Sequence, residues 1–159
     1  MQIIRKRSIV DDGWVHLADG DVVPADGDVL VSLDRWHAER ENLLGRSGRL
    51  GVVLPNTIDP RELADDLPHL AVVAVHFPIY RDGRGFSIGR LLRERLRYKG
   101  EIRAVGNVLR DQLLFMERCG FDAYELQDGK NLENALEGFE DFSVTYQDAI
   151  TPRSAPRAR

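Results

Sequence analysis

The chain has 159 residues, of which 43% are hydrophobic and 30% are charged, and its formal net charge is −4; these values suit one globular domain with its own core. No apolar run is long enough to cross a bilayer, and Asp11 and Asp12 interrupt the N-terminal region too early for a secretory signal. One cysteine, Cys119, excludes an internal disulfide, so we expect a cytoplasmic protein that acts away from membranes.

The first 28 residues are predicted to form an N-terminal β-hairpin. Residues 14–17 and 22–24 contain strand-forming side chains on either side of residues 18–21, whose Asp and Gly residues favour a turn. We expect a single α/β domain over residues 1–150, in which this hairpin precedes the main sheet. The end of the chain, residues 151–159, is rich in Pro and Arg and is predicted to be a disordered tail.

From residue 29 onward, short β-rich runs alternate with helical patterns, which is typical of repeated βα units. About six mostly parallel strands are expected, in an open sheet or a partial barrel, because a closed barrel of this type needs eight such units. The expected strands are residues 29–33, 50–54, 70–77, 102–105, 123–126 and 143–146.

Several helix boundaries are readable. Asp59 is a predicted N-cap, followed by a proline at the first helical position. Asn107 is expected to cap a helix over 108–118, which Gly120 ends in a left-handed conformation. Asn131 is the predicted cap of a helix with an apolar stripe. Two further helices are expected over 34–44 and over 88–98, the second capped by Ser87.

The basic residues cluster although the chain is acidic overall. Residues 81–110 hold nine basic and three acidic side chains, a net charge of +6. Such an asymmetry favours an anionic ligand or an acidic partner over nucleic acid, for which the whole domain should be basic. We therefore expect no binding of nucleic acid.

The loop after the strand 70–77 is about ten residues longer than its counterparts, and parallel α/β folds place binding loops at this edge. Its glycines, a helix N-terminus and the nearby arginines suit a phosphate, a sulfate, a sulfite or a carboxylate. The alternative is a glycine-rich turn before an ordinary amphipathic helix with a solvated arginine face. The predicted anion-binding residues are Arg84, Gly85, Ser87, Arg90, Asn107 and Arg110.

Catalytic residues are harder to assign. His76 ends an apolar strand beside the loop and can act as a general acid or base, or be a structural histidine. Asp82 in the loop is the other candidate. No spacing of His or Cys residues indicates a metal site, and Cys119 is expected to be buried and inert.

Residues 77–95 and 100–126 resemble the conserved stretches of a bacterial family of unknown function. Over 77–95 the sequence is Phe-Pro-Ile-Tyr-Arg-Asp-Gly-Arg-Gly-Phe-Ser-Ile-Gly-Arg-Leu-Leu-Arg-Glu-Arg. Members carry the label of probable oxidoreductases involved in sulfite reduction and tend to lie beside assimilatory sulfite reductase. Asn107 stands where the family is expected to carry Asp.

The resemblance implies an accessory protein of assimilatory sulfite reduction that acts with sulfite reductase or its electron-donor system and binds a small anion. Sulfite reduction requires siroheme and an iron–sulfur cluster, for which the chain offers no recognisable ligands, so no intrinsic cofactor is expected. The alternative is a small enzyme that binds a phosphorylated ligand or flavin mononucleotide at the same loop.

Overall fold

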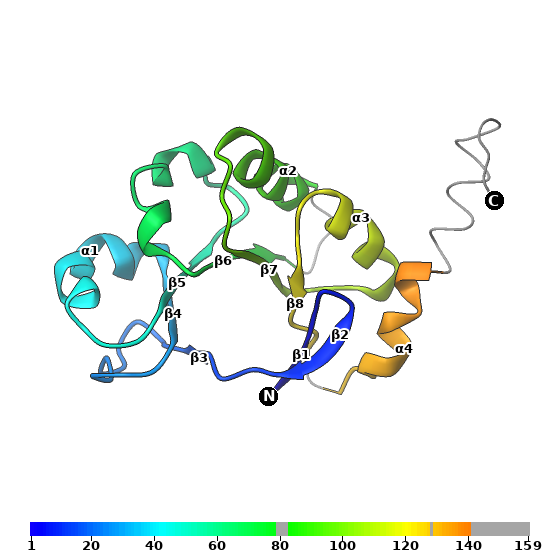
Figure 1. Cartoon of the computed structure of the whole chain (residues 1–159), viewed down its shortest axis with the longest axis horizontal. Coiled ribbons are helices and arrows are strands. Elements are labelled where there is room, and N and C mark those ends of the chain that lie inside the picture. Colours follow the sequence, from blue (N-terminus) through cyan, green and yellow to red (C-terminus); the bar gives the residue numbers. More distant parts are fainter. Residues whose placement is uncertain (79–82, 128, 141–159) are drawn as a thin grey trace.

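The computed structural model describes residues 1–78, 83–127 and 129–140. Within these residues, eight strands form one curled, open sheet, and the helical segments cover its convex side (Figure 1). The strand order is β2-β1-β8-β7-β6-β5-β4-β3. The α/β class and the partial barrel agree with the prediction, although the described residues form eight strands and not about six.

Six strands that follow one another in the chain run parallel, each paired with the next. The expected strands from 29–33 to 123–126 all belong to this parallel series, whereas the expected strand 143–146 lies outside the described residues. The parallel strands are β3 (Val15–His16), β4 (Val29–Ser32), β5 (Leu50–Leu54), β6 (Val72–Phe77), β7 (Glu101–Gly106) and β8 (Ala123–Tyr124).

The N-terminal hairpin exists, but it lies earlier in the chain than predicted. Strands β1 (Gln2–Arg5) and β2 (Ser8–Asp11) pair antiparallel, joined by Lys6 and Arg7 at φ 50° and 65°. Two residues in the left-handed region fit a tight hairpin turn. Residues 14–17 were predicted to belong to the hairpin but contain β3, which runs parallel to β4. The prediction failed because Lys and Arg do not signal a turn, whereas Gly and Asp after β3 do.

The helical segments are short. Asp59 and Asn131 cap their helices with side-chain hydrogen bonds, as predicted, and Gly120 adopts the expected left-handed conformation at φ 106°. The segments are α1 (Leu33–Leu44), the 3₁₀ helices η1 (Pro60–Leu63) and η2 (Leu67–His69), α2 (Arg84–Arg90) with the π-helical turn η3 (Leu91–Arg95), the 3₁₀ helix η4 (Arg110–Gln112), α3 (Leu113–Arg118) and α4 (Leu132–Leu136).

Two predicted helix starts are wrong. The helix expected over 88–98 begins at Arg84, so Ser87 lies inside α2 and does not cap it. The helix expected over 108–118 begins with η4, whose flanking residue is Leu109 and not Asn107. Glycines obscured the first start, because their low helix propensity resembles that of a loop.

Those glycines are explained by packing. A Cβ atom added at Gly85 would lie 2.7 Å from the ring of Phe77, and one added at Gly89 would lie 2.3 Å from the ring of Phe121. Glycine therefore lets α2 approach the sheet and the chain after α3 closely. Close approach to a ligand is not needed to explain either residue.

The main core lies between the convex face of the sheet and the helical segments. Alternate residues of the central strands β4 to β7 enter it, for example Val73, Val75 and Phe77 on β6. Trp36 of α1 and Leu92 of η3 pack against these side chains and are completely buried. The period-two alternation of β6 thus separates a convex face from a concave face.

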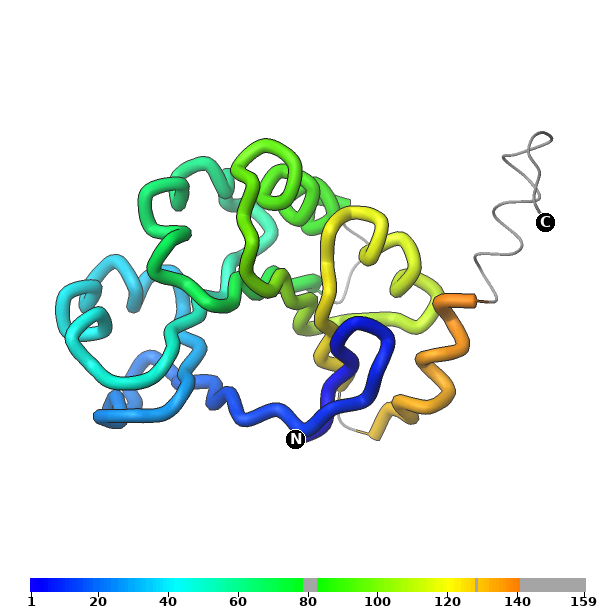
Figure 2. The backbone as a smooth tube through the Cα atoms, in the orientation of Figure 1, coloured from blue at the N-terminus to red at the C-terminus, as the bar shows by residue number. Residues whose placement is uncertain are grey.

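The concave face is filled by the N-terminal segment. After the hairpin at one end of the curl, the chain crosses the open side to reach β3 at the other end (Figure 2). Trp14, which lies in this crossing segment, packs against Leu30, Val72, Ala74 and Val105 on the concave face. The crossing segment, residues 12–16, is called the strap below.

Candidate functional site

A cavity of about 240 Å³ lies where the loop after β5 meets α2. The loop forms one wall, and one face of α2 and η3 forms the other. Because the two elements follow the carboxyl ends of neighbouring parallel strands, the cavity lies at the edge where α/β folds place ligands. Its lining residues are Asn56, Thr57, Ile58, Asp59, Pro60, Arg61, Arg84, Ser87, Ile88 and Leu91.

Hydrogen-bond donors gather in this cavity. Arg84 and Ser87 lie one helical turn apart on α2, so both reach the same side of the helix. On the facing loop, Asn56 also lines the cavity, and its Nδ2 is buried with no hydrogen-bond partner among the described residues. A buried amide donor without an acceptor is costly, and a bound anion would supply the missing acceptor.

One carboxylate also borders the cavity. Asp59 accepts hydrogen bonds from the guanidinium Nε and Nη2 of Arg61, at 3.0 and 2.8 Å. The side-chain and backbone hydrogen bonds from Arg61 lower the pKa of Asp59 to about 2, so the carboxylate stays ionised at neutral pH. The charges of Asp59 and Arg61 cancel, so the described lining residues, which also include Arg84, have a formal net charge of +1.

Of the six predicted anion-binding residues, the structure brings only Arg84 and Ser87 together in this cavity. Gly85 is buried against Phe77. Arg90, at the end of α2, donates from Nη2 to Sγ of Cys119, 3.4 Å away, and this contact raises the pKa of Arg90. Arg90 therefore joins α2 to the end of α3 and does not line this cavity.

Asn107 and Arg110 are also placed elsewhere. The backbone N–H of Asn107 donates to the carbonyl of Phe77, 2.8 Å away, and so extends the pairing of β6 with β7. Arg110 donates from Nη1 to Oδ1 of Asn134 at 3.0 Å and lies 3.6 Å from the carboxylate of Glu137. Arg110 thus ties η4 to the region of α4.

The two catalytic candidates do not form a site with these residues. His76 lies on the concave face of β6 and is exposed. The ring of His76 lies beside Gly106, where an added Cβ would be 3.0 Å from the ring. Asp82 lies outside the described residues. The chemistry at His76 stays a prediction from the sequence.

The basic stretch 81–110 does not form one charged surface. Its chain crosses from one edge of the sheet to the other and then returns through β7, so its arginines face different surroundings. Arg84 reaches the cavity, Arg93 donates to the carbonyls of Tyr98 and Gly100 at 2.8 Å, and Arg103 lies inside the half barrel. Clustering along the sequence was a poor guide to clustering in space.

A buried network of charges on the concave face was not predicted. The side chain of Arg103 is completely buried. Its guanidinium contacts Asp12 at 2.9 Å, Glu101 at 2.7 Å and Glu125 at 2.6 Å. Burial alone would lower the pKa of Arg103, but the hydrogen bonds that it donates to these carboxylates, together with their charges, outweigh burial and raise the pKa. Arg5 joins the network through Glu101, at 2.7 Å.

Two contacts of this network hold the strap. Besides the pair formed by Asp12 and Arg103, Nε2 of His16 lies 2.8 Å from Oε2 of Glu125. Burial raises the pKa of Glu125, but hydrogen bonds from His16 and Arg103 oppose it and leave the pKa below its ordinary value. The strap and Glu125 are far apart in the sequence. The spacing of residues along the chain therefore could not indicate the contact between His16 and Glu125.

One signal in the sequence did point to the network. Glu101 and Arg103 alternate with the apolar residues of β7, so both must face the concave side. Charged side chains on the inner face of a half barrel need partners. The sequence analysis did not identify Asn56 and Arg61 as cavity residues. Both lie in the segment that follows β5, and their place in the cavity is evident only when the position of α2 is known.

The model of a family described as "Bacterial protein of unknown function (DUF934)" matches residues 51–156. The chain belongs to this family. The matched region contains every residue that lines the cavity. It also contains Arg103 and Glu125 of the charge network, whereas Asp12 and His16 of the strap precede it.

No curated protein and no solved structure matches the chain. Among the described residues, no group of three or more His, Cys, Asp and Glu side chains is placed to hold a metal ion. No helix in the same part of the chain has the length and apolarity required to cross a membrane. Cys119 is buried, as predicted.

Proposed function

We propose that this DUF934 protein is an accessory protein of assimilatory sulfite reduction and that it binds a small oxyanion, sulfite or sulfate, in the cavity between the loop after β5 and α2. The observation that carries the proposal is Asn56, which lines the cavity together with Arg84 and Ser87 and whose buried Nδ2 has no acceptor among the described residues. The partner is sulfite reductase or its electron-donor system, as the resemblance over residues 77–126 implies.

The chemistry of the lining suits an oxyanion. An amide N–H, a hydroxyl and a guanidinium each donate a hydrogen bond, and charge-assisted bonds are the strongest of these. A sulfite or sulfate oxygen would satisfy the amide donor of Asn56, and Arg84 would offset part of the ligand's charge. Ile88 and Leu91 close the apolar side of the cavity, which lowers the local dielectric and strengthens the electrostatic contacts.

Size and composition favour a small anion over the flavin mononucleotide alternative. At about 240 Å³, the cavity lies below the range of roughly 300–1,000 Å³ that is usual for sites of larger ligands. None of the described lining residues is aromatic, so none of them offers a ring to stack on an isoalloxazine. A phosphate remains compatible with the donors and must be compared directly with sulfite and sulfate.

The thermal stability of the protein in increasing sulfite, sulfate or phosphate tests the proposal. Each bound anion should raise the Tm by mass action, with the largest response to sulfite or sulfate. Asn56→Ala, Arg84→Gln and Ser87→Ala should each weaken binding by about tenfold or more, because each removes a donor worth roughly 1–3 kcal/mol. Arg95→Gln is the matched control, since Arg95 is an exposed arginine just beyond α2 and does not line the cavity.

The growth of cells that carry these variants tests whether anion binding is linked to sulfite reduction. Cells that depend on the Arg84→Gln variant should grow poorly on sulfate and normally on cysteine, whereas the Arg95→Gln variant should support both. If the three cavity variants, Asn56→Ala, Arg84→Gln and Ser87→Ala, respond to the anions as the wild-type protein does, the cavity is not the anion site. If binding is lost but growth on sulfate is normal, the link to sulfite reduction is wrong.

A further inference from the structure

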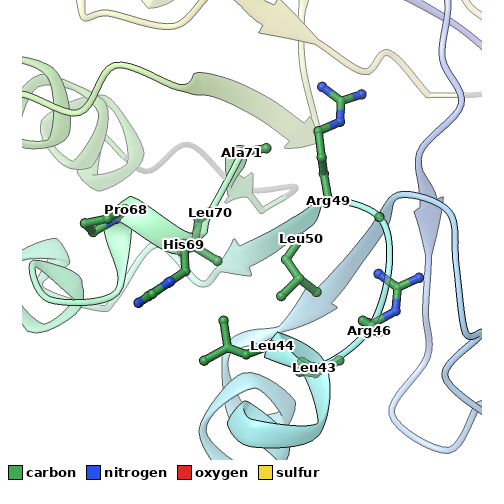
Figure 3. A pocket seen from close by; sticks show the side chains of 10 residues that line it. Leu43, Leu44, Arg46, Arg49, Leu50, Pro68, His69, Leu70 and Ala71 are labelled. Atoms are coloured by element: carbon green, nitrogen blue, oxygen red, sulfur yellow. The ribbon is translucent and has the colours of Figure 1, made fainter.

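Two adjoining depressions lie at the amino-terminal edge of the sheet, opposite the cavity described above. The first has a volume of about 320 Å³ and lies between the end of α1, the start of β5 and η2 (Figure 3). The second, of about 380 Å³, lies on the other side of η2. They share Pro68 and Leu70 and form one surface, called the basal surface below.

The basal surface combines an apolar floor with a cationic rim. Leu50, Leu70 and Leu96 belong to the floor, and Leu44 is 38% exposed at its edge. No described residue that lines either depression carries a carboxylate, although the chain as a whole is acidic. The side chains that are cationic or can become so are Arg46, Arg49, His69, Arg97 and Lys99.

Two of these side chains are already engaged. Arg46 donates to the carbonyls of Pro24 and Gly27 at 2.9 and 2.7 Å, and Arg49 pairs with Asp28 at 2.7 Å. In contrast, His69, Arg97 and Lys99 are exposed. Within residues 1–78, 83–127 and 129–140, these three side chains have no hydrogen bond or ion pair. They remain available to a partner.

The loop that carries Arg97 and Lys99 is held rigidly. The Tyr98 hydroxyl donates to the carbonyl of Leu70, 2.7 Å away. Arg93 donates from Nη1 to the carbonyls of Tyr98 and Gly100, both at 2.8 Å. A charge presented on a fixed loop loses little conformational freedom when a partner binds.

The backbone of Arg97 has an unusual conformation. Its φ is 56°, in the left-handed region that glycine adopts readily and arginine seldom does. Folding stability alone would therefore favour glycine at this position. An arginine whose side chain makes no contact that stabilises the fold is better explained by a contact with another molecule.

We infer that the basal surface docks an acidic, amphipathic segment of a partner protein. Carboxylates of the segment would face His69, Arg97 and Lys99, and its apolar side chains would cover Leu44 and the floor. The apolar floor favours a protein over a nucleic acid, whose phosphates would gain nothing from leucine side chains. This inference does not depend on the anion site, which lies at the opposite edge of the sheet.

Fluorescence anisotropy with a labelled helical peptide, in which glutamates flank a leucine face, tests the inference. The wild-type protein should bind the peptide, and higher salt should weaken binding. Arg97→Gly together with Lys99→Gln should weaken binding by about tenfold and should not lower the Tm, because glycine suits the backbone at position 97. Arg95→Gln removes an exposed arginine outside the basal surface and should bind like the wild type.

Two controls define the contact. Polyglutamate without leucine should bind at least about tenfold more weakly, because it leaves the floor uncovered, and single-stranded DNA should compete poorly. The inference is overturned if the wild type does not bind the peptide, if the double variant binds it equally well, or if polyglutamate or DNA binds as tightly. Loss of peptide binding with a normal response to sulfite would leave the anion site unaffected, so the two proposals fail separately.

Discussion

At the scale of single residues, glycine and arginine determine how this chain packs. Gly85 and Gly89 allow α2 to lie against two phenylalanine rings. Arg103 is buried inside the half barrel, where three carboxylates surround it. Such a charge is tolerated only when its partners are all present, because removing one side leaves an uncompensated buried charge.

The packing of Gly89 gives a direct test. Gly89→Ala should destabilise the protein by about 1–3 kcal/mol, because the new methyl group would overlap the Phe121 ring and overpacking a core costs this much. The higher helix propensity of alanine, worth about 1 kcal/mol, offsets only part of the destabilisation that the overlap causes. Gly83→Ala is the matched control: nothing lies within 4 Å of its added Cβ, so it should be neutral or stabilising. Urea denaturation measures both, and a stable Gly89→Ala protein would contradict the packing described.

At the scale of elements, the strap closes the open side of the half barrel. Its ends are held by the contacts of Asp12 with Arg103 and of His16 with Glu125, and Trp14 fills the interior between them. None of this could be predicted from local patterns, because the strap is short and its partners are about a hundred residues away in sequence. Patterns of alternation identified the parallel strands well, since each strand has two differently buried faces.

The strap makes stability depend on pH through Glu125. Because its pKa is lower in the folded protein than its ordinary value of 4.5, the ionised form stabilises the fold. That contribution is present above the ordinary pKa and is lost as the pH falls through the folded pKa. The difference in unfolding free energy between wild type and Glu125→Gln should therefore be largest above the ordinary pKa of 4.5 and shrink as the pH falls below it.

Denaturant unfolding at a series of pH values measures this difference. Glu133→Gln, on the exposed side of α4, serves as the matched control, and its curve should run parallel to that of the wild type. The two groups next to Glu125, His16 and Arg103, are unchanged in both variants. A difference that stays constant or grows as the pH falls would show that Glu125 does not stabilise the fold in its ionised form.

At the scale of the whole molecule, the sequence was sufficient for the class of fold and for the edge that carries the cavity. The parallel βα units and two of the residues at the cavity, Arg84 and Ser87, follow from patterns along the chain. Arg90 and Arg110 do not line this cavity, because a run of charge in sequence is divided among several faces once α2 and β7 are folded. Asn56 could be found only after the loop and the helix were seen to face each other.

The two edges of the half barrel then have different proposed roles. The proposed oxyanion would bind at the carboxyl edge beside α2, and the proposed acidic segment would dock at the amino edge beside η2. This separation allows a partner to dock without covering the anion cavity. It also means that changes at one edge should leave binding at the other intact, since no described residue lines both surfaces.

The most direct test of the anion site is a crystal grown with selenate, a sulfate analogue whose selenium gives an anomalous signal. The account predicts an anomalous peak in the cavity, with oxygen atoms of the anion within hydrogen-bond distance of Asn56 Nδ2 and Ser87 Oγ, and no such peak in Arg84→Gln crystals grown in the same way. A peak only elsewhere on the protein, or an equal peak in the Arg84→Gln variant, would contradict it.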